Sequence, residues 1–387
     1  ELDQEPLFQE YIRLAVNSSS ALKRLLPRKG VPGFSQEVSR VLASFVLSNA
    51  KLTSSNYHRG ALENSVRDIK AGDVHDAARR LADYLMDPNE EAAKLRAYLF
   101  FHFLGGSIAS AMVNATQPIT MTAPYLLQFG DAKQVSSEMF RASMEAVKNK
   151  PGIDVRAAYS RALEEGIIAP HEIHMLMAES GASMFDSGAL RRFTKVWGSF
   201  FAMAETFNRR TTFIAAYRMA VANEIPNPYG FAKEAVYETQ GIYNKGNRPN
   251  LARGRVGAVI FTFKQFAISY IEFLKRLPPR EFAIALTILF LLAGLEGMPF
   301  AEDIEDIIDT VMQWRGHNWS TKREMRKGVT AGIAALAKML GAEDDLAAAL
   351  GKGVGQFVLH GVSAVPGFPL DISARMGMHN LIPGTGV

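Results

Sequence analysis

Two histidines and a glutamate at residues 171–174 come closest to a metal-binding motif. In a metalloprotease zinc helix the two histidines are four residues apart, with a glutamate between them. His171 and His174 are only three residues apart, with Glu172 between them. No third ligand is evident, and the chain contains no cysteine, which excludes thiolate metal sites and thiol nucleophiles. We therefore expect no metal site and no cofactor.

Acidic and glycine-rich segments near the end of the chain offer little more chemistry. Glu305, Asp306 and Asp309 could share a helix face and bind a cation or transfer protons, although such clusters are more often solvated. The glycines at 351, 353 and 355 follow no predicted strand, as a phosphate-binding loop would, and Gly351 and Gly355 have the spacing of close helix packing. No serine-nucleophile or P-loop motif is present. The sequence therefore predicts that the chain is not an enzyme.

A polar set interrupts the aromatic helix that apolar spacing predicts over residues 189–223. Glu205 and Arg209 have the i, i+4 spacing of a helical ion pair, and Asn208 and Arg210 lie beside them. Buried groups of this kind would need polar partners. Three interpretations stay open: a salt bridge on the helix surface, a structural polar cluster in the core, or a catalytic group.

Positive charge is concentrated in the third quarter of the chain. Residues 201–280 contain 12 Lys and Arg against 5 Asp and Glu, whereas residues 281–387 contain 8 against 12. Lys245, Arg248, Arg253 and Arg255 lie in a Gly-, Pro- and Asn-rich stretch that reads as a loop. Such a loop suits the phosphates of a lipid headgroup or of nucleic acid. A solvated loop, or a partner for the acidic tail, is the alternative.

Strongly apolar runs are the most unusual feature of the sequence. They cover residues 97–113, 256–274, 282–295 and 329–365, and charges mostly flank them. The run at 282–295 is shorter than the roughly 20 residues of a spanning helix. The runs fit either a large helical core or helices that contact lipid or other subunits. The candidate contact residues are Phe100, Phe101, Phe103, Phe261, Phe263, Phe266, Leu289, Phe290 and Leu291.

The whole chain reads as an all-α, multi-helix assembly with several strongly apolar helices and no significant sheet. Its 387 residues are 48% hydrophobic and 21% charged, which excludes a disordered chain. No signal peptide is visible, and the missing initiator Met suggests a processed product or a piece of a longer protein. Three regions are expected: an amphipathic N-terminal region (1–88), a central core with the basic loop (89–277), and a C-terminal region of apolar and acidic helices with a Pro/Gly-rich tail (278–387).

Four segments in the second half of the chain carry a family resemblance. Two are Glu205-Thr-Phe-Asn-Arg-Arg210, which runs on to Tyr217, and Phe261-Thr-Phe-Lys-Gln-Phe266. The others are Pro369-Leu-Asp-Ile-Ser-Ala-Arg-Met-Gly377 and Asn380-Leu-Ile-Pro-Gly-Thr385. With them the chain resembles the C-terminal helical module of very large bacteriophage polyvalent proteins of the PLxRFG type, although that motif is not literally present. Similar modules occur in the internal virion proteins of short-tailed phages.

The resemblance implies a function in genome delivery. It implies an internal virion (ejection) protein that is stored in the virion interior and later enters the host cell envelope, where it helps form a conduit for DNA. Its partners would be further copies of itself, other ejection or portal and tail proteins, bacterial membrane lipid and phage DNA. The alternative is a scaffold or packaging module of a giant phage polypeptide that stays in the capsid and has no membrane role.

Overall fold

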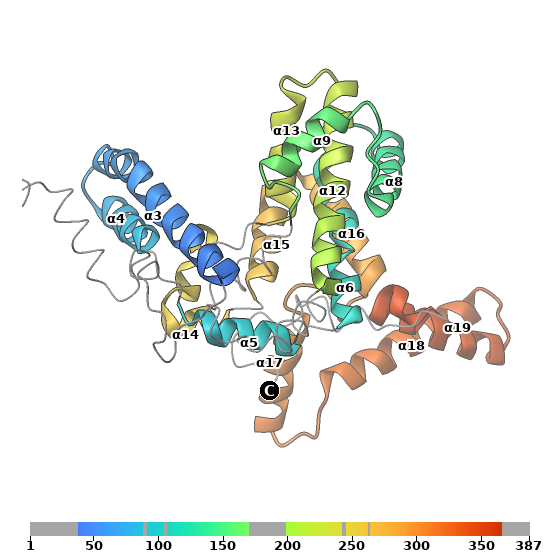
Figure 1. Cartoon of the computed structure of the whole chain (residues 1–387). Coiled ribbons are helices and arrows are strands. Elements are labelled where there is room, and N and C mark those ends of the chain that lie inside the picture. The colour runs from blue at the N-terminus through green and yellow to red at the C-terminus, as the bar shows by residue number, and fades with distance from the viewer. Residues whose placement is uncertain are drawn as a thin grey trace, which may run out of the picture. The chain divides into compact units, whose positions relative to one another are not determined.

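The computed structural model describes residues 38–87, 91–103, 107–169, 199–241, 245–261 and 264–365. These residues form helices and connecting turns, with no strand among them, which confirms the all-α prediction (Figure 1). The chain forms two compact units. The described parts of unit 1 are residues 38–87, 91–97 and 245–247, and those of unit 2 are 98–103, 107–169, 199–241, 248–261 and 264–365. The three expected regions, with boundaries at residues 88 and 277, stay a prediction.

Unit 1 is built on a pair of helices. Helix α3 (Val38–Arg67) and helix α4 (Asp73–Met86) are joined by a short turn and pack against each other. A hydrogen bond from Ser55 Oγ to Met86 Sδ (3.2 Å) links the two helices. Helix α5 (Ala93–Phe103) follows and runs from unit 1 into unit 2, and the short 3₁₀ turn η4 (Lys245–Asn247) also belongs to unit 1.

Unit 2 contains the remaining elements. In chain order they are α6 (Ile108–Asn114), the π-helical turn η2 (Pro118–Thr122), α7 (Ala123–Leu126), α8 (Ala132–Lys148), α9 (Arg156–Glu164), α12 (Ser199–Ala222), α13 (Pro228–Thr239), the 3₁₀ turn η5 (Asn250–Ala252), α14 (Gly254–Ile260), α15 (Gln265–Arg276), α16 (Pro279–Ala293), α17 (Ala301–Trp314), α18 (Thr321–Met339), α19 (Asp344–His360) and the 3₁₀ turn η6 (Gly361–Ala364).

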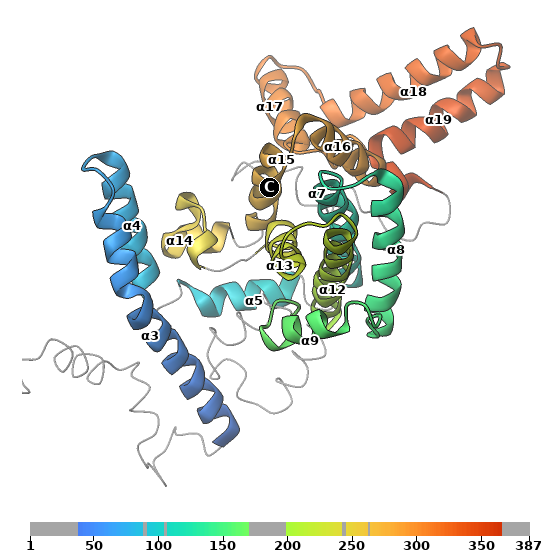
Figure 2. The ribbon, with the colours of Figure 1, turned by 90° about the horizontal axis from the view of Figure 1, so that it is seen from above.

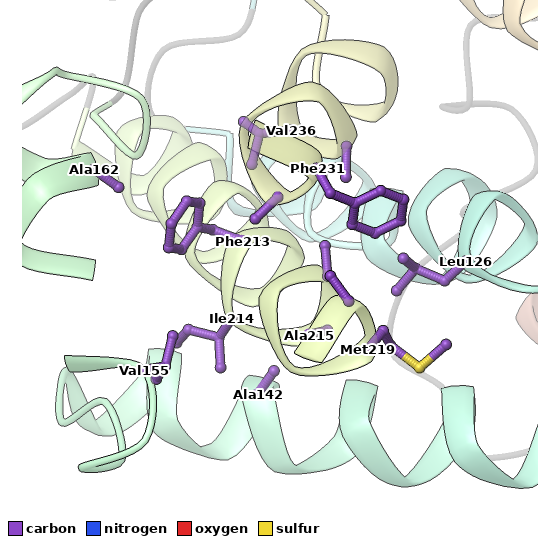
Figure 3. Close-up of a cluster of buried hydrophobic side chains, with 14 of the residues drawn as sticks. Leu126, Ala142, Val155, Ala162, Phe213, Ile214, Ala215, Met219, Phe231 and Val236 are labelled. Carbon is purple, nitrogen blue, oxygen red and sulfur yellow. The ribbon is translucent and has the colours of Figure 1, made fainter. Parts of the chain in front are cut away.

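Helix α12 is the central element of unit 2. It packs against α6, α8, α13 and η2, and its residues from Ala204 to Ala220 are buried around most of the helix circumference. A helix that is enclosed on several sides must be apolar or internally paired all round. Figure 3 shows Phe213, Ile214 and Met219 of α12 between Ala142 of α8 and the α13 side chains Phe231 and Val236. This cluster is the larger of two apolar cores.

A second apolar core lies on the other side of the π-helical turn. It joins Met121 of η2 to Tyr270 and Phe273 of α15 and to Leu289 of α16. The neighbouring Thr122 of η2 instead reaches α12 and α13 through hydrogen bonds. Successive residues of this one turn therefore contact α15 and α16 on the one hand and α12 and α13 on the other.

Local sequence signals account for where several helices begin and end. Asp131 caps α8 by accepting a hydrogen bond from the Gln134 amide (2.8 Å), and Asn149 ends that helix in the left-handed conformation. Helices α13 and α16 carry Pro228 and Pro279 in their first turns, where a missing amide hydrogen costs nothing.

Two of the long apolar runs are divided into short helices. The run at 97–113 is split between α5, which ends at Phe103, and α6, which begins at Ile108. The run at 256–274 is split between α14 and α15, with a break after Ile260. Among the described residues, no helix combines the length and the apolar character that crossing a bilayer requires. The expected strong apolarity of these helices therefore stays a proposal.

Helices α16 and α19 end against each other at two glycines. Gly294 follows α16 with φ 66° and ψ −166°, a region that glycine alone adopts readily, and Gly361 follows α19 with φ 60°. A Cβ at Gly294 would overlap the Leu359 carbonyl group. Two backbone hydrogen bonds join the same ends, from the Leu295 amide to the Val358 carbonyl (2.9 Å) and from the Glu296 amide to the Leu359 carbonyl (3.1 Å).

The Gly294→Ala variant tests this junction. We expect it to lower the free energy of unfolding of unit 2 by about 2–4 kcal/mol, since it adds both backbone strain and overlap. Gly332→Ala is the matched control, because a Cβ there meets no atom of the described chain within 4 Å. Urea denaturation followed by circular dichroism measures both variants. Equal stability of the two would show that the junction tolerates a side chain.

Candidate functional site

A buried ion pair lies at the centre of the polar cluster on α12. Arg209 is fully buried, and its Nε donates to Glu205 Oε1 at 3.1 Å. The remaining guanidinium nitrogens donate to backbone carbonyls, Nη2 to Gly241 (3.0 Å) and Nη1 to Ile167 (3.4 Å). Gly241 lies just after the end of α13 and Ile167 just after the end of α9, so one side chain binds the segments that follow two helices. Hydrogen bonds to carbonyl oxygens stabilise a buried cation.

Asn208 binds the carboxyl-terminal end of a third helix, α6. It is fully buried, and its Nδ2 donates to the Asn114 carbonyl at 2.8 Å. Asn114 is the last residue of α6, where a helix leaves carbonyl groups without intrahelical partners. Asn208 and Arg209 together thus tie the end of α6 and the segments after α9 and α13 to α12.

A hydroxyl cluster continues the polar core along α12. Thr212 Oγ1 of α12 lies 2.7 Å from Thr122 Oγ1 of η2, which lies 3.1 Å from Thr239 Oγ1 of α13. The Gln240 side-chain amide donates to Thr212 Oγ1 at 3.2 Å. All four side chains are buried. Their mutual hydrogen bonds fix which faces of α12, α13 and η2 meet, because any other register would leave hydroxyl groups unpaired.

The predicted set Glu205, Asn208 and Arg209 is therefore brought together in the core. The geometry is that of the structural alternative: Glu205 and Arg209 bind each other, Asn208 binds the end of α6, and none of the three is more than 6% exposed. The solvent-exposed salt bridge that the spacing also allowed does not occur.

A second charged network, which the sequence analysis missed, holds the other end of α12. Arg218 is buried, and its Nε donates to Asp154 Oδ2 at 2.6 Å while its Nη2 donates to Glu145 Oε1 at 2.9 Å. The hydrogen bond from Arg218 holds the pKa of Asp154 below its usual value. Glu145 also accepts a hydrogen bond from the Gly152 amide (2.9 Å). These partners are more than 60 residues away in sequence, so no local spacing signals the network.

The basic loop residues lie in different environments. Arg255 is exposed and Arg253 is half-buried, with its Nε donating to the Arg248 carbonyl at 3.2 Å. Arg248 is buried, which does not suit a phosphate contact. The side chain of Lys245 lies outside the described part, and the residue belongs to unit 1, whereas the three arginines belong to unit 2. Phosphate binding by this loop stays a prediction.

The candidate contact residues are likewise divided. Phe103 and Leu291 are exposed, and Phe261, Phe266 and Phe290 are half-buried. Leu289 is fully buried in the second apolar core, so its assignment as a contact residue is wrong: it is the α16 residue that faces α15 and η2. The side chains of Phe100, Phe101 and Phe263 lie outside the described residues.

Some of the residues that the sequence analysis singled out lie outside the part of the chain that the structure describes. His171, Glu172 and His174 lie outside the described residues, as do the first 37 residues and the tail from 366 to 387. The described residues contain no group of three or more His, Cys, Asp or Glu placed to hold a metal ion.

Helix α17 carries the acidic residues that the sequence places on one helix face. The exposure of its opposite, apolar face was not expected. Ile304, Ile307, Ile308 and Val311 follow the spacing of one helix face, and all four are exposed. Trp314, at the end of the same face, is 85% exposed. The spacing of the isoleucines signals an amphipathic helix, but not that its apolar face stays uncovered.

Comparison with family models, curated proteins and solved structures finds no match to this chain.

The buried ion pair predicts a large cost for removing its cation. Arg209→Met removes the cation that balances the buried Glu205 carboxylate and takes a donor from the carbonyls of Ile167 and Gly241. We expect the free energy of unfolding to fall by about 3–5 kcal/mol. Arg255→Met, at an exposed position, should change it by less than about 0.5 kcal/mol. Chemical denaturation measures both, and similar losses for the two would exclude a central role for Arg209.

The Arg218 network predicts an acid-sensitive contribution to stability. Because the folded-state pKa of Asp154 is lowered, its contribution is complete above the unfolded value of about 3.9 and is lost as pH falls through the folded value. Asp154→Asn should therefore flatten the fall in stability below about pH 4. Thermal denaturation from pH 2 to 5 measures this, with the exposed Asp345→Asn as control. An unchanged pH slope for Asp154→Asn would contradict the assignment.

Proposed function

We propose that the chain is a helical internal virion protein of the ejection type. It is stored in the virion interior, passes into the host cell envelope and there helps form the conduit for the phage genome. The proposal assigns it no chemical reaction. The observation that carries it is the uncovered apolar face of α17, and the family resemblance gives the biological setting.

The first segment of the family resemblance has a structural role in this chain. Glu205, Asn208 and Arg209 belong to that segment, and their contacts organise the core of unit 2. A motif that fixes the packing of helices supports a shared helical architecture more than a shared catalytic activity. The likeness therefore supports a type of protein and no particular reaction.

Helix α17 has the character of a helix that lies in a membrane interface. Its apolar face, defined by Ile304, Ile307, Ile308 and Val311, is opposite Glu302, Glu305 and Asp309. Such helices bury one face at the boundary between headgroups and acyl chains, and an exposed Trp such as Trp314 favours the same depth. Lying on the bilayer requires no membrane-spanning length.

The acidic face makes the expected lipid contact depend on pH. Burial raises the pKa of Glu305, and the carboxylates of Glu296, Glu302 and Asp309 raise it further against the opposing effect of Lys322. A raised pKa means that Glu305 becomes neutral earlier as pH falls. Since charge repulsion from anionic headgroups then weakens, binding to anionic vesicles should increase on acidification.

Further contacts with lipid, DNA and other proteins belong to the same proposal. The apolar helices α14, α15 and α16 and the exposed Phe103 and Leu291 would contact lipid or neighbouring subunits. Arg253 and Arg255 would face the phosphates of lipid or DNA, and other ejection, portal or tail proteins would be the protein partners.

A capsid-internal scaffold without a membrane role is the second candidate. The division of the apolar runs into short helices favours it, because helices this short pack within a protein assembly without any contact with lipid. It requires protein partners for the face of α17 and predicts no affinity for lipid.

Flotation with vesicles separates these candidates. We expect the whole chain to float with vesicles that contain phosphatidylglycerol, and the floating fraction to rise as pH falls toward the range in which carboxyl groups are protonated. The double variant Ile304→Glu/Ile307→Glu should lose most of this binding, because it places charge on the exposed apolar face.

Gln313→Glu is the matched control, because Gln313 is exposed on the opposite side of α17. It adds negative charge without changing the apolar face and should keep most of the binding. An absence of flotation at every pH, with the chain folded, would reject the lipid contact and favour the scaffold. Equal binding by both variants would exclude α17 as the contact.

A further inference from the structure

Helices α18 and α19 form an antiparallel hairpin with a close inner seam. They lie side by side and are joined by a short turn at residues 340–343 (Figure 2). Gly351 and Gly355 of α19 face α18, where a Cβ at Gly351 would lie 2.7 Å from the Thr330 carbonyl oxygen. The i, i+4 glycine spacing thus serves close packing within the hairpin, and Ala337 and Ala347 complete the seam.

Beside this seam, each helix carries an apolar stripe. Val329, Ile333, Leu336 and Leu340 recur at helical spacing on α18, and Leu346, Leu350, Val354 and Phe357 do so on α19. Each stripe is displaced from its own seam in the same rotational sense about the helix axis. Because the helices are antiparallel, equal displacement puts both stripes on one side. We call this two-helix surface the hairpin face.

Much of the hairpin face is open to solvent. Leu340 is 81% exposed, and Leu336, Leu346, Leu350 and Val354 are exposed as well. Met339 at its edge is 84% exposed. Charged side chains such as Lys327, Lys338 and Lys352 point to the opposite side of the helices. A layer with one apolar side and one charged side needs a second layer to cover it.

Charge changes along the hairpin. The turn end has three acidic residues, Glu343, Asp344 and Asp345, against one basic residue, Lys338. The opposite end has four basic residues, Lys322, Arg323, Arg326 and Lys327, against one acidic residue, Glu324. The hairpin therefore has an acidic turn end and a basic opposite end.

We propose that the hairpin face binds the hairpin face of a second copy in antiparallel orientation, as a two-fold symmetric four-helix layer pair. Reversal brings the acidic turn end of one copy over the basic end of the other. Leu340 then lies over Met325 of the second copy, and Glu343 over Lys322. Opposite charges therefore face each other at both ends at once, as an isologous contact requires.

A parallel pair lacks this match, because it places like charges opposite one another. The acidic turn end also disfavours an anionic bilayer as the occupant of the face. The inference does not depend on whether the chain acts in genome ejection.

Cross-linking of introduced cysteines tests the orientation, since the chain has no cysteine of its own. One preparation carries Leu340→Cys and the other Met325→Cys. After mixing and treatment with a short bismaleimide, a cross-linked dimer between the two variants should form in clear excess over dimers of either variant alone. Dimers of Leu340→Cys alone would show a parallel pair and overturn the proposal, as would the absence of any cross-link.

Sedimentation velocity then tests the hairpin face itself in the full chain. Leu336→Glu/Leu350→Glu should weaken self-association at least about tenfold, because it places charge at the centre of the apolar contact. Ala331→Glu, exposed on the other side of α18, should leave self-association unchanged. Circular dichroism confirms that each variant is folded. A monomeric unaltered chain, or equal association of both variants, would overturn the proposal.

Discussion

A single buried cation sets the constraints on unit 2. The Arg209 guanidinium is excluded from solvent, so its charge must be balanced within the protein. One carboxylate, Glu205, and the carbonyl groups just after α9 and α13 provide that balance. Because these partners come from separate helices, the position of α12 is coupled to theirs. Asn208 extends the same coupling to α6, and the hydroxyl cluster around Thr212 extends it to η2.

The sequence predicts the helices and some of the pairings, but not the partners that decide the packing. Proline and capping residues locate the ends of α8, α13 and α16, and the spacing of Glu205 and Arg209 predicts their ion pair. The carbonyls of Ile167 and Gly241 carry no side-chain signal, so their role could not be foreseen. The breaks within the apolar runs at 97–113 and 256–274 were missed for a related reason: one long apolar helix and two short ones share the same composition.

The face of α17 and the hairpin face are both uncovered in the described part of unit 2, and their charges differ. The face of α17 is opposite carboxylates, and the hairpin face runs from an acidic to a basic end. The apolar face of α17 has no feature that specifies a particular protein partner. It therefore suits contact with the apolar region of a membrane interface. The hairpin face is complementary to itself. A chain that associates through one surface and meets lipid through the other could present several copies of α17 to the same membrane.

Vesicle leakage tests the conduit function most directly. Vesicles of phosphatidylethanolamine and phosphatidylglycerol would be loaded with a small dye and with a large labelled dextran, and the whole chain added at pH 5 and pH 7. The conduit account predicts release of the small dye while the dextran is retained, because a passage of limited width discriminates by size. Intact vesicles at both pH values would contradict it. Equal release of both solutes would also contradict it, since that indicates bilayer rupture.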